Sequence, residues 1–317
     1  MYRSKRVIAV FAAFAALIFS TAVSAQLRLP RPSQWASVTQ TVGVTDITIS
    51  YSRPGVKGRA IFGDPPKDSY AKGEDTLDDQ YKRPEGMAIV PYGHVWRSGA
   101  NEATQFVVTD DVTINGQKLA AGKYSLHTIP GKDEWTIVFN GTANQWGSFS
   151  YDPAKDTLRV KAKPEWMKDN QEWLEYSFDP VSDNSAVVNI RWEKARVPFT
   201  VEVDVPKVAL IHARDAVNAA KADDWRTPLN AAQYAKQNKA DADATAWLAK
   251  SLAAADESIK AKETFGNLAG KANILFLMGR KDEALATADK ALERGKADKA
   301  DTAAFEKRIA DIKAGKM

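Results

Sequence analysis

The chain has 317 residues, a formal net charge of +4 and no cysteine. The lack of cysteine excludes disulfide bonds, thiol catalysis, iron–sulfur clusters and N-terminal lipidation, so a packed core must hold the fold together. A length of this order predicts two domains, because one domain usually takes about 150 residues.

The first 25 residues have the features of an export signal. Three cations within the first six residues precede an apolar run over 7–19, and Val-Ser-Ala at 23–25 fits a cleavage site. A membrane anchor is the alternative, but the run is shorter than the roughly 20 residues that cross a bilayer. We therefore expect cleavage after Ala25, no membrane insertion of the product, and a periplasmic or secreted location. Loss of the three cations lowers the formal charge from +4 to +1, which disfavours nucleic acid as a partner.

Residues 27–205 have the pattern of an antiparallel β-sandwich. Apolar and polar residues alternate, as at 45–51 and 122–129, which places one face of each strand on a core. Asn115-Gly116 between two short apolar runs predicts a two-residue hairpin turn, since both residues tolerate positive φ. No strand is followed by a helix long enough for a parallel crossover. Further β-type runs, which bring the total to about ten and favour a sandwich, lie at 134–140, 158–163, 174–178, 187–192 and 197–205.

One acidic stretch interrupts this half of the chain. Residues 64–86 hold seven acidic side chains and few apolar ones. Such a composition cannot bury enough apolar surface to form a core, so we expect a solvated surface loop here.

Residues 206–317 are predicted to form an all-α domain of helical hairpins. Their composition shifts to Ala, Lys and Asp, and apolar residues recur at spacings of three and four. The run from Leu268 to Leu292, with a turn at 279–281, resembles one tetratricopeptide repeat, and a weaker echo lies 40 residues upstream. A plain helical bundle is the alternative. Either arrangement suggests contact with a protein partner.

Two loops gather the side chains that carry chemistry. The loop over 52–59 alternates cations with glycines, so it is suited to a carboxylate or phosphate; its alternative is a solvated hairpin. The loop over 91–104 packs aromatic, basic, amide and acidic groups between glycines just before a strand. The candidate ligand-binding residues are Arg53, Lys57, Arg59, Tyr92, His94, Trp96, Arg97, Asn101 and Glu102.

Trp96 and Arg97 are central to this candidate site. A tryptophan at the start of a strand is more often a core anchor than a ligand platform, because it buries a large area. Arg97 beside a core strand needs a partner, and Glu102 or Asp46 is expected to supply it. We predict that Arg97 and Glu102 form a coupled pair that shapes the loop.

No metal site and no cofactor are predicted. The three histidines, His94, His127 and His212, are far apart in the sequence. A site of His94, His127 and Glu102 is the alternative, but a chance approach of two histidines on neighbouring strands explains the pattern as well. The match of residues 69–72 to Ser-x-x-Lys falls in the acidic loop, so we expect it to be a coincidence.

Three motifs stand out in the β half: Tyr-Ser-Arg-Pro-x-x-Lys-Gly-Arg at 51–59, Phe-Gly at 62–63, and Pro-Tyr-Gly-x-x-Trp-Arg-x-Gly-Ala-Asn-Glu-Ala-Thr at 91–104. Together they resemble the bacterial domain-of-unknown-function family DUF2911, over about residues 34–205. Similar proteins carry export signals and helical repeats, and the resemblance implies no activity. Phe-Gly lies close to Pro-Tyr-Gly in the family, so the resemblance implies that residues 64–89 are an insertion beside the motif.

The expected function is binding rather than catalysis, because no nucleophile with a base and no metal set is present at recognisable positions. The ligand is expected to be a small anion or a glycan, within a binding or scaffold module of the cell envelope. The alternative is an envelope hydrolase acting on glycan, with Glu102 as acid and Asp110 or Asp111 as partner. Such a hydrolase would need its carboxylates about 5 to 9.5 Å apart in a cleft.

Overall fold

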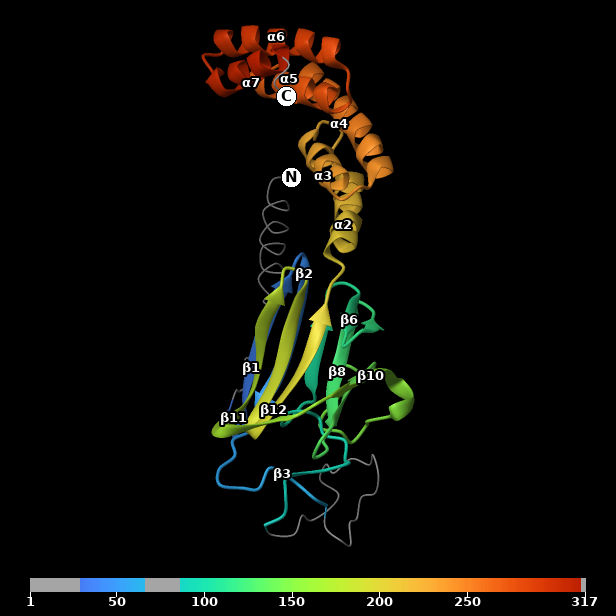
Figure 1. Ribbon diagram of the computed structural model, residues 1–317, viewed down its shortest axis with the longest axis vertical. Helices are drawn as coiled ribbons and strands as arrows, with labels where there is room; N and C mark the ends of the chain where they lie inside the picture. The colour runs from blue at the N-terminus through green and yellow to red at the C-terminus, as the bar shows by residue number, and fades with distance from the viewer. Residues whose placement is uncertain (1–28, 66–85, 315–317) are drawn as a thin grey trace, which may run out of the picture.

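The structure, a computed structural model, describes residues 29–65 and 86–314. The predicted export signal lies outside the described residues, and so does most of the predicted 64–89 insertion. A β-sandwich comes first in the chain, and a curved column of helices follows it (Figure 1). The predicted fold class, an antiparallel β-sandwich followed by helices, is confirmed.

The larger sheet has six strands in the order β1-β2-β5-β8-β9-β10. All of its pairings are antiparallel. Alternation decides which side chains enter the core: Ile47, Ile49 and Tyr51 of β2 are buried on one face, and hydroxyl groups occupy the other. The strands are β1 (Gln34–Val42), β2 (Thr45–Arg53), β5 (Thr104–Val108), β8 (Gly122–Ile129), β9 (Trp135–Asn140) and β10 (Asp156–Ala162), with a short 3₁₀ helix η1 (Pro153–Lys155) before the last.

The second sheet has four strands in the order β11-β12-β6-β7. The predicted hairpin turn is confirmed, since Asn115 and Gly116 have φ of 45° and 80° between β6 and β7. The runs at 187–192 and 197–205, predicted as two strands, form one long strand that ends at Glu202. Glu193 takes a left-handed backbone conformation with φ of 54° and the pairing register shifts beside it, so the alternation slips while the strand continues. The strands are β11 (Glu165–Ser182), β12 (Ser185–Glu202), β6 (Val112–Ile114) and β7 (Gln117–Leu119).

A two-stranded parallel pair departs from the antiparallel expectation. β3 (Phe62–Gly63) pairs with β4 (Val90–Pro91), and this pairing brings the Phe-Gly motif beside the Pro-Tyr-Gly motif. This pairing brings together the residues that flank the predicted insertion, which itself stays a prediction.

The core between the two sheets is built from large aromatic and branched side chains. Phe106 lies 4.9 Å from Phe139, and Phe199 lies 6.0 Å from Phe139, as distances between ring centroids. All three rings are 1% exposed or less. They come from both sheets, so the core depends on contacts between strands far apart in the sequence.

Six described helices follow the sandwich. Positions 40 residues apart are buried in pairs, as Ala232 with Ala272 and Ala244 with Ala284, so the sequence echo has a structural counterpart. No helix within residues 29–65 and 86–314 combines the length and apolar character needed to cross a membrane. The helices are α2 (Val205–Ala219), α3 (Arg226–Gln237), α4 (Asp241–Ala261), α5 (Phe265–Leu277), α6 (Lys281–Ala297) and α7 (Ala303–Lys313).

Helix α2 is anchored on the sandwich by a few side chains. The carboxylate of Asp204 caps the helix by accepting a hydrogen bond from the Lys207 backbone N–H. Val208 is 5% exposed and joins the sandwich core. His212 Nε2 lies 2.7 Å from Asp110 Oδ1. The packing of the sandwich thus extends a short way past the predicted boundary at residue 205.

Candidate functional site

The nine predicted site residues do not form one cluster. Their two loops lie at the end of the sandwich that faces away from the helices (Figure 1). Arg59, His94, Trp96 and Arg97 line one pocket. The other five lie in three further places: Arg53 and Lys57 beside β11, Asn101 and Glu102 beside the segment before β1, and Tyr92 beside Asp64 and Lys132.

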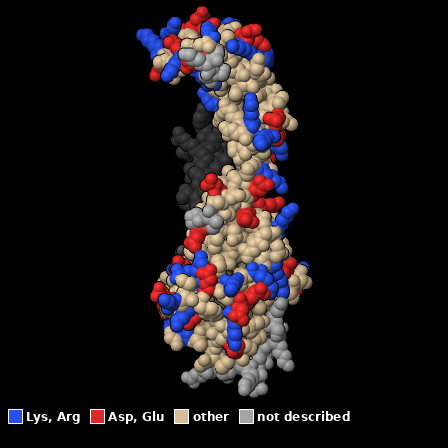
Figure 2. Space-filling view, in the orientation of Figure 1, with Lys and Arg blue, Asp and Glu red and all other residues tan. Residues whose placement is uncertain are grey.

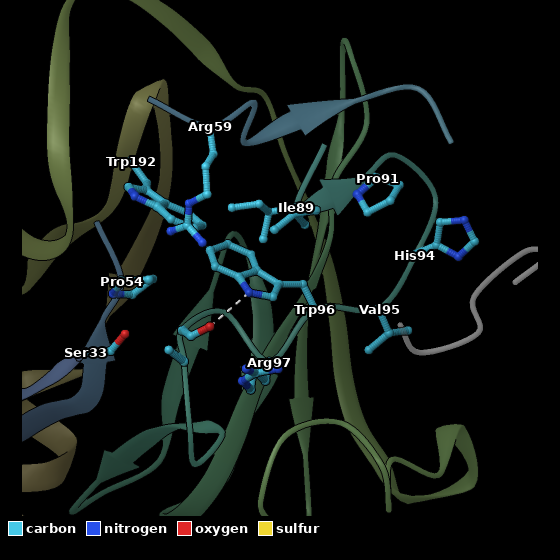
Figure 3. A pocket seen from close by; sticks show the side chains of 13 residues that line it. Ser33, Pro54, Arg59, Ile89, Pro91, His94, Val95, Trp96, Arg97 and Trp192 are labelled. Atoms are coloured by element: carbon cyan, nitrogen blue, oxygen red, sulfur yellow. Dashed lines mark hydrogen bonds between the residues drawn. The ribbon is translucent and has the colours of Figure 1, made fainter. Parts of the chain in front are cut away.

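The pocket has a volume of about 260 Å³. In Figure 3, the side chain of Arg59 points toward the rings of Trp96 and Trp192, and Arg97 lies on the side of Trp96 opposite to Arg59. The remaining wall is largely apolar and backbone, including Pro54, Ile89 and Gly99. This combination of a flat aromatic wall with a few convergent polar groups is typical of small-molecule sites.

The aromatic wall is rigid. The rings of Trp96 and Trp192 stack at 5.5 Å with an interplanar angle of 20°. Phe62 and Trp135 meet Trp96 edge-on, at 6.0 and 6.5 Å. The indole N–H of Trp96 donates to the Gly99 carbonyl at 3.1 Å. Trp96 is only 8% exposed, so it is the core anchor that the sequence favoured and a wall of the pocket as well.

The indole N–H of Trp192 has no acceptor among the described residues. Its side chain is 2% exposed, and within the described part of the chain no group accepts a hydrogen bond from Nε1. An unsatisfied buried donor costs about 1–3 kcal/mol. The indole N–H of Trp135 is likewise unsatisfied, but Trp192 lines the pocket, so its donor is available to an acceptor atom of a ligand there.

Arg59 holds its guanidinium group at the pocket through its own loop. Nε donates to the Val56 carbonyl at 3.1 Å, and Nη2 donates to the Gly55 carbonyl at 2.5 Å. These two bonds fix the plane of the group. Among the described residues that line the pocket none is acidic, whereas two are arginine and one is histidine. The described lining therefore favours a ligand that accepts hydrogen bonds and carries negative charge.

A buried hydrogen-bond network holds the backbone that follows Arg97. Ser98 has a left-handed conformation with φ of 55° and is fully buried. Its carbonyl accepts hydrogen bonds from the hydroxyls of Tyr176 and Thr104, both at 2.9 Å, and its own hydroxyl donates to Thr128 at 3.0 Å. Burial raises the pKa of Tyr176, so its phenol stays a donor. Strain of this kind persists only where the surroundings impose it, and it often marks functional sites.

The structure gives Glu102 a partner that the sequence did not suggest. Arg31 Nη1 donates to both carboxylate oxygens of Glu102, at 2.7 and 2.8 Å. Asp46, the other partner considered for Arg97, accepts a hydrogen bond from the Thr41 hydroxyl at 2.6 Å. The coupled pair of Arg97 with Glu102 stays a prediction, and Arg31 now competes for the same carboxylate.

Asn101 joins the end of β2 to the segment before β1. Its amide N–H donates to the Ser33 carbonyl and the Ser52 hydroxyl, both at 3.2 Å. Like Ser98, Asn101 has a left-handed backbone, with φ of 59°. Asn101 therefore holds the loop through these hydrogen bonds and does not line the pocket.

Tyr92 lies apart from the pocket lining. Burial, followed by the nearby carboxylate of Asp64, raises the pKa of its phenol, and Lys132 opposes this rise. Lys132 itself pairs with Asp64 at 2.9 Å. Tyr92 therefore belongs to a surface ion-pair group.

The geometry also bears on metal binding and on hydrolysis. Within residues 29–65 and 86–314, no group of three His, Asp or Glu side chains is placed to hold a metal ion.

Glu102 and Asp110 lie beyond opposite ends of β5 (Thr104–Val108). At about 3.3 Å per residue, the five-residue strand between them spans about 13 Å. The strand alone is longer than the roughly 5 to 9.5 Å between a pair of hydrolytic carboxylates.

The pocket lies within a segment that matches a known protein family. A family model described as a protein of unknown function, DUF2911, matches residues 33–201. The chain belongs to the DUF2911 family. The resemblance carried by its three motifs is thereby confirmed, and the match includes Ser33 and Trp192, at opposite ends of the matched span, which both line the pocket. Comparisons with curated proteins and with solved structures gave no match.

Several residues beside the candidate sites were not identified from the sequence. Trp192 ends an apolar run that indicated only a core strand, and Arg31 lies in a proline-containing segment without a recognisable motif. Trp173 stands in a polar stretch of β11 and packs beside Lys57. These residues meet the motif loops through long-range pairing, so no local spacing could reveal them.

Proposed function

We propose that this DUF2911 protein is an exported, non-enzymatic binding protein of the cell envelope, and that its pocket takes a small organic anion with a flat ring. The pocket has a rigid aromatic wall, and its described lining includes two arginines and no acidic residue. A flat ring would stack on Trp96, and a carboxylate would accept from Arg59.

The observation that carries this proposal is the buried N–H of Trp192. An acceptor atom on the ligand would satisfy a donor that no described side chain satisfies. Binding would then recover a desolvation cost that the empty pocket bears. This supports binding in preference to a role for Trp192 in packing alone.

A second part of the proposal concerns the helical column. The buried positions that repeat after 40 residues support a tetratricopeptide-like stack that contacts a protein partner. Nucleic acid is a poor candidate for that partner. Figure 2 shows Lys and Arg side chains interspersed with Asp and Glu on the sandwich and on the column, without a continuous basic stripe.

Export rests on the signal-like features of residues 1–25. Intact-mass analysis of the chain recovered from the envelope fraction is expected to give a product that begins at Gln26. Recovery of the unprocessed chain from the membrane pellet would contradict both cleavage and the periplasmic location.

The binding proposal is tested by thermal shift of the processed chain with benzoate, acetate and inorganic phosphate. Benzoate at 100 times its dissociation constant should stabilise the protein by about 2.7 kcal/mol. Acetate and phosphate, which lack the ring, should give smaller shifts. No shift with any of the three anions would contradict the proposal.

Two variants and one matched control make the test specific. Trp192→Phe keeps an aromatic ring but removes the N–H, and Arg59→Gln removes the cation; both should abolish the benzoate shift. Lys57→Gln removes a cation from the same loop outside the pocket lining, so the shift should remain. Equal losses in Arg59→Gln and Lys57→Gln would show non-specific charge attraction instead of a site.

A further inference from the structure

An exposed tryptophan marks a second pocket, separate from the one above. Trp173 on β11 is 41% exposed, although burial of a large aromatic side chain is normally favourable. It forms a wall of a surface pocket of about 300 Å³, together with Pro32, Gln34 and Arg53. What distinguishes Trp173 from the other exposed tryptophans, Trp35, Trp146 and Trp166, is that its ring lines this pocket and is available to a ligand there.

The backbone around Trp173 is held on both sides. The Val56 N–H donates to the Glu172 carbonyl at 2.8 Å, and the Leu174 N–H donates to the Pro54 carbonyl at 3.0 Å. The indole lies directly against Gly55, where an added Cβ would come within 3.2 Å of a ring carbon. Glycine allows this close approach, and the two backbone hydrogen bonds hold the segment that carries the ring.

Polar groups surround the ring in fixed positions. Arg53 Nε donates to the Leu174 carbonyl at 2.8 Å, and Nη2 lies 3.8 Å from Glu175 Oε2. Lys57 Nζ lies 5.8 Å from the centroid of the Trp173 ring. The Lys57 backbone, left-handed with φ of 49°, is held by the Glu172 carboxylate, which accepts from its N–H at 2.9 Å.

The charges at this pocket are balanced, in contrast to the first pocket. The two cations, Arg53 and Lys57, are matched by two carboxylates, Glu172 and Glu175. Balanced charge gives no preference for an ionic ligand. It leaves a fixed indole, a planar guanidinium and the amide of Gln34, which together suit a ligand with an apolar face and several hydroxyl groups.

We propose that Trp173, Arg53 and Gln34 bind the pyranose ring of a neutral saccharide. The C–H face of the ring stacks on the indole, while adjacent hydroxyls pair with the planar guanidinium and amide groups. This site is distinct from the anion pocket, since the two pockets share no described lining residue, although they adjoin at residues 32–34 and 53–54.

The proposal is tested by ¹⁹F NMR of the processed chain labelled with 5-fluorotryptophan, titrated with chitotriose and with maltotriose. The Trp173 signal, identified by its loss in Trp173→Phe, is expected to shift with at least one of the two saccharides. Trp173→Phe should weaken binding at least tenfold, as measured by calorimetry. Gln34→Ala, a change on an exposed side chain that leaves the core intact, should weaken it several-fold.

Trp166 provides the matched control. It lies on the same strand and is 47% exposed, but it does not line the pocket. Its signal should stay constant, and Trp166→Phe should bind the saccharide as the parent chain does. Equal shifts at Trp166 and Trp173 would show non-specific contact and overturn the proposal, as would the absence of any Trp173 shift with both saccharides. The benzoate experiment reports on the other pocket, so either result stands alone.

Discussion

The sandwich and the helical column differ in the side chains that dominate their cores. The sandwich buries large rings such as Phe106 and Phe199, which meet across two sheets. The column buries many alanines, such as Ala272 and Ala288, both 0% exposed, beside a few large side chains such as Trp225. A core of large side chains is sensitive to truncation because a cavity remains, whereas a core of small side chains is sensitive to enlargement.

The same difference explains where the candidate sites lie. In the sandwich, residues distant in sequence meet, as in the hydrogen bond from Tyr176 to Ser98, which are 78 positions apart. Such contacts bring chemically different side chains together on the loops at one end of the sandwich. In the column the contacts are between neighbouring helices, which produces an extended surface.

The largest expected effect is from truncation in the sandwich core. Phe106→Ala should lower the free energy of unfolding of the sandwich by about 3–5 kcal/mol, because the side chain is fully buried among other rings. Calorimetry of the full chain should show the sandwich transition moving down while the helical transition keeps its midpoint. A common shift of both transitions would mean that the two regions unfold as one unit and would remove the basis of the comparison.

Enlargement in the column comes next. At Gly270 of α5, an added Cβ would overlap the ring of Trp225. Gly270→Ala should therefore destabilise the column by about 1–3 kcal/mol, although alanine is the better helix former. Gly266 lies in the same helix, and the nearest atoms to its added Cβ are 3.9 Å away. Gly266→Ala should be neutral or stabilising by up to about 1 kcal/mol. If both variants behave alike in urea unfolding, close packing does not limit the column.

Much of the fold follows from the sequence because its signals are local. Alternation and the Asn115-Gly116 turn predict strands and one hairpin, and both are present. The merging of two predicted runs into β12 was missed, since it depends on the left-handed Glu193 opposite a register shift in β11. The parallel β3-β4 pair was also missed, because it joins residues on either side of the acidic loop.

The candidate sites were only half predictable for the same reason. The motif at 91–104 identified Trp96 and Arg97, which do line the pocket. It could not separate them from Glu102, which faces Arg31, or reveal Trp192, which arrives from the other sheet. Residues that are neighbours in sequence on a tight loop point in different directions. Grouping these residues by their proximity in the sequence therefore treated several separate positions in the structure as one site.

A smaller effect is expected where the two regions join. A fragment of residues 27–205 should melt cooperatively, because its own core is continuous. A fragment extended through α2, to residue 219, should be more stable by about 1.5 kcal/mol, since it adds the burial of Val208. An unfolded shorter fragment, as judged by circular dichroism and calorimetry, would show that the column completes the sandwich.

The junction should also depend on pH. Burial alone would raise the pKa of Asp110, but hydrogen bonds from His212, Thr45 and Thr109 outweigh it and hold the pKa below its ordinary value. The folded state therefore holds this proton less tightly than the unfolded chain. The stabilisation is complete above the unfolded pKa of about 4 and is lost as pH falls through the folded value. His212→Ala should lower the free energy of unfolding by roughly 0.5–1 kcal/mol at pH 7. The effect is small because the imidazole is partly exposed. In Asp110→Asn this part of the acid-induced loss should disappear; an unchanged pH profile would argue against it.

The smallest expected effect decides which arginine Glu102 pairs with. Arg31 and Glu102 are both partly exposed, at 50% and 33%, so their coupling in a double-mutant cycle should be about 0.2–1 kcal/mol and should fall with added salt. A parallel cycle of Arg97 with Glu102 tests the pairing that the sequence predicted. If Arg97 and Glu102 form a buried pair, Arg97→Ala alone should lower the free energy of unfolding by about 3–5 kcal/mol. If the Arg97 cycle gives the larger coupling, the loop is held by the predicted pair, and the Arg31 contact is a surface interaction with little energetic weight.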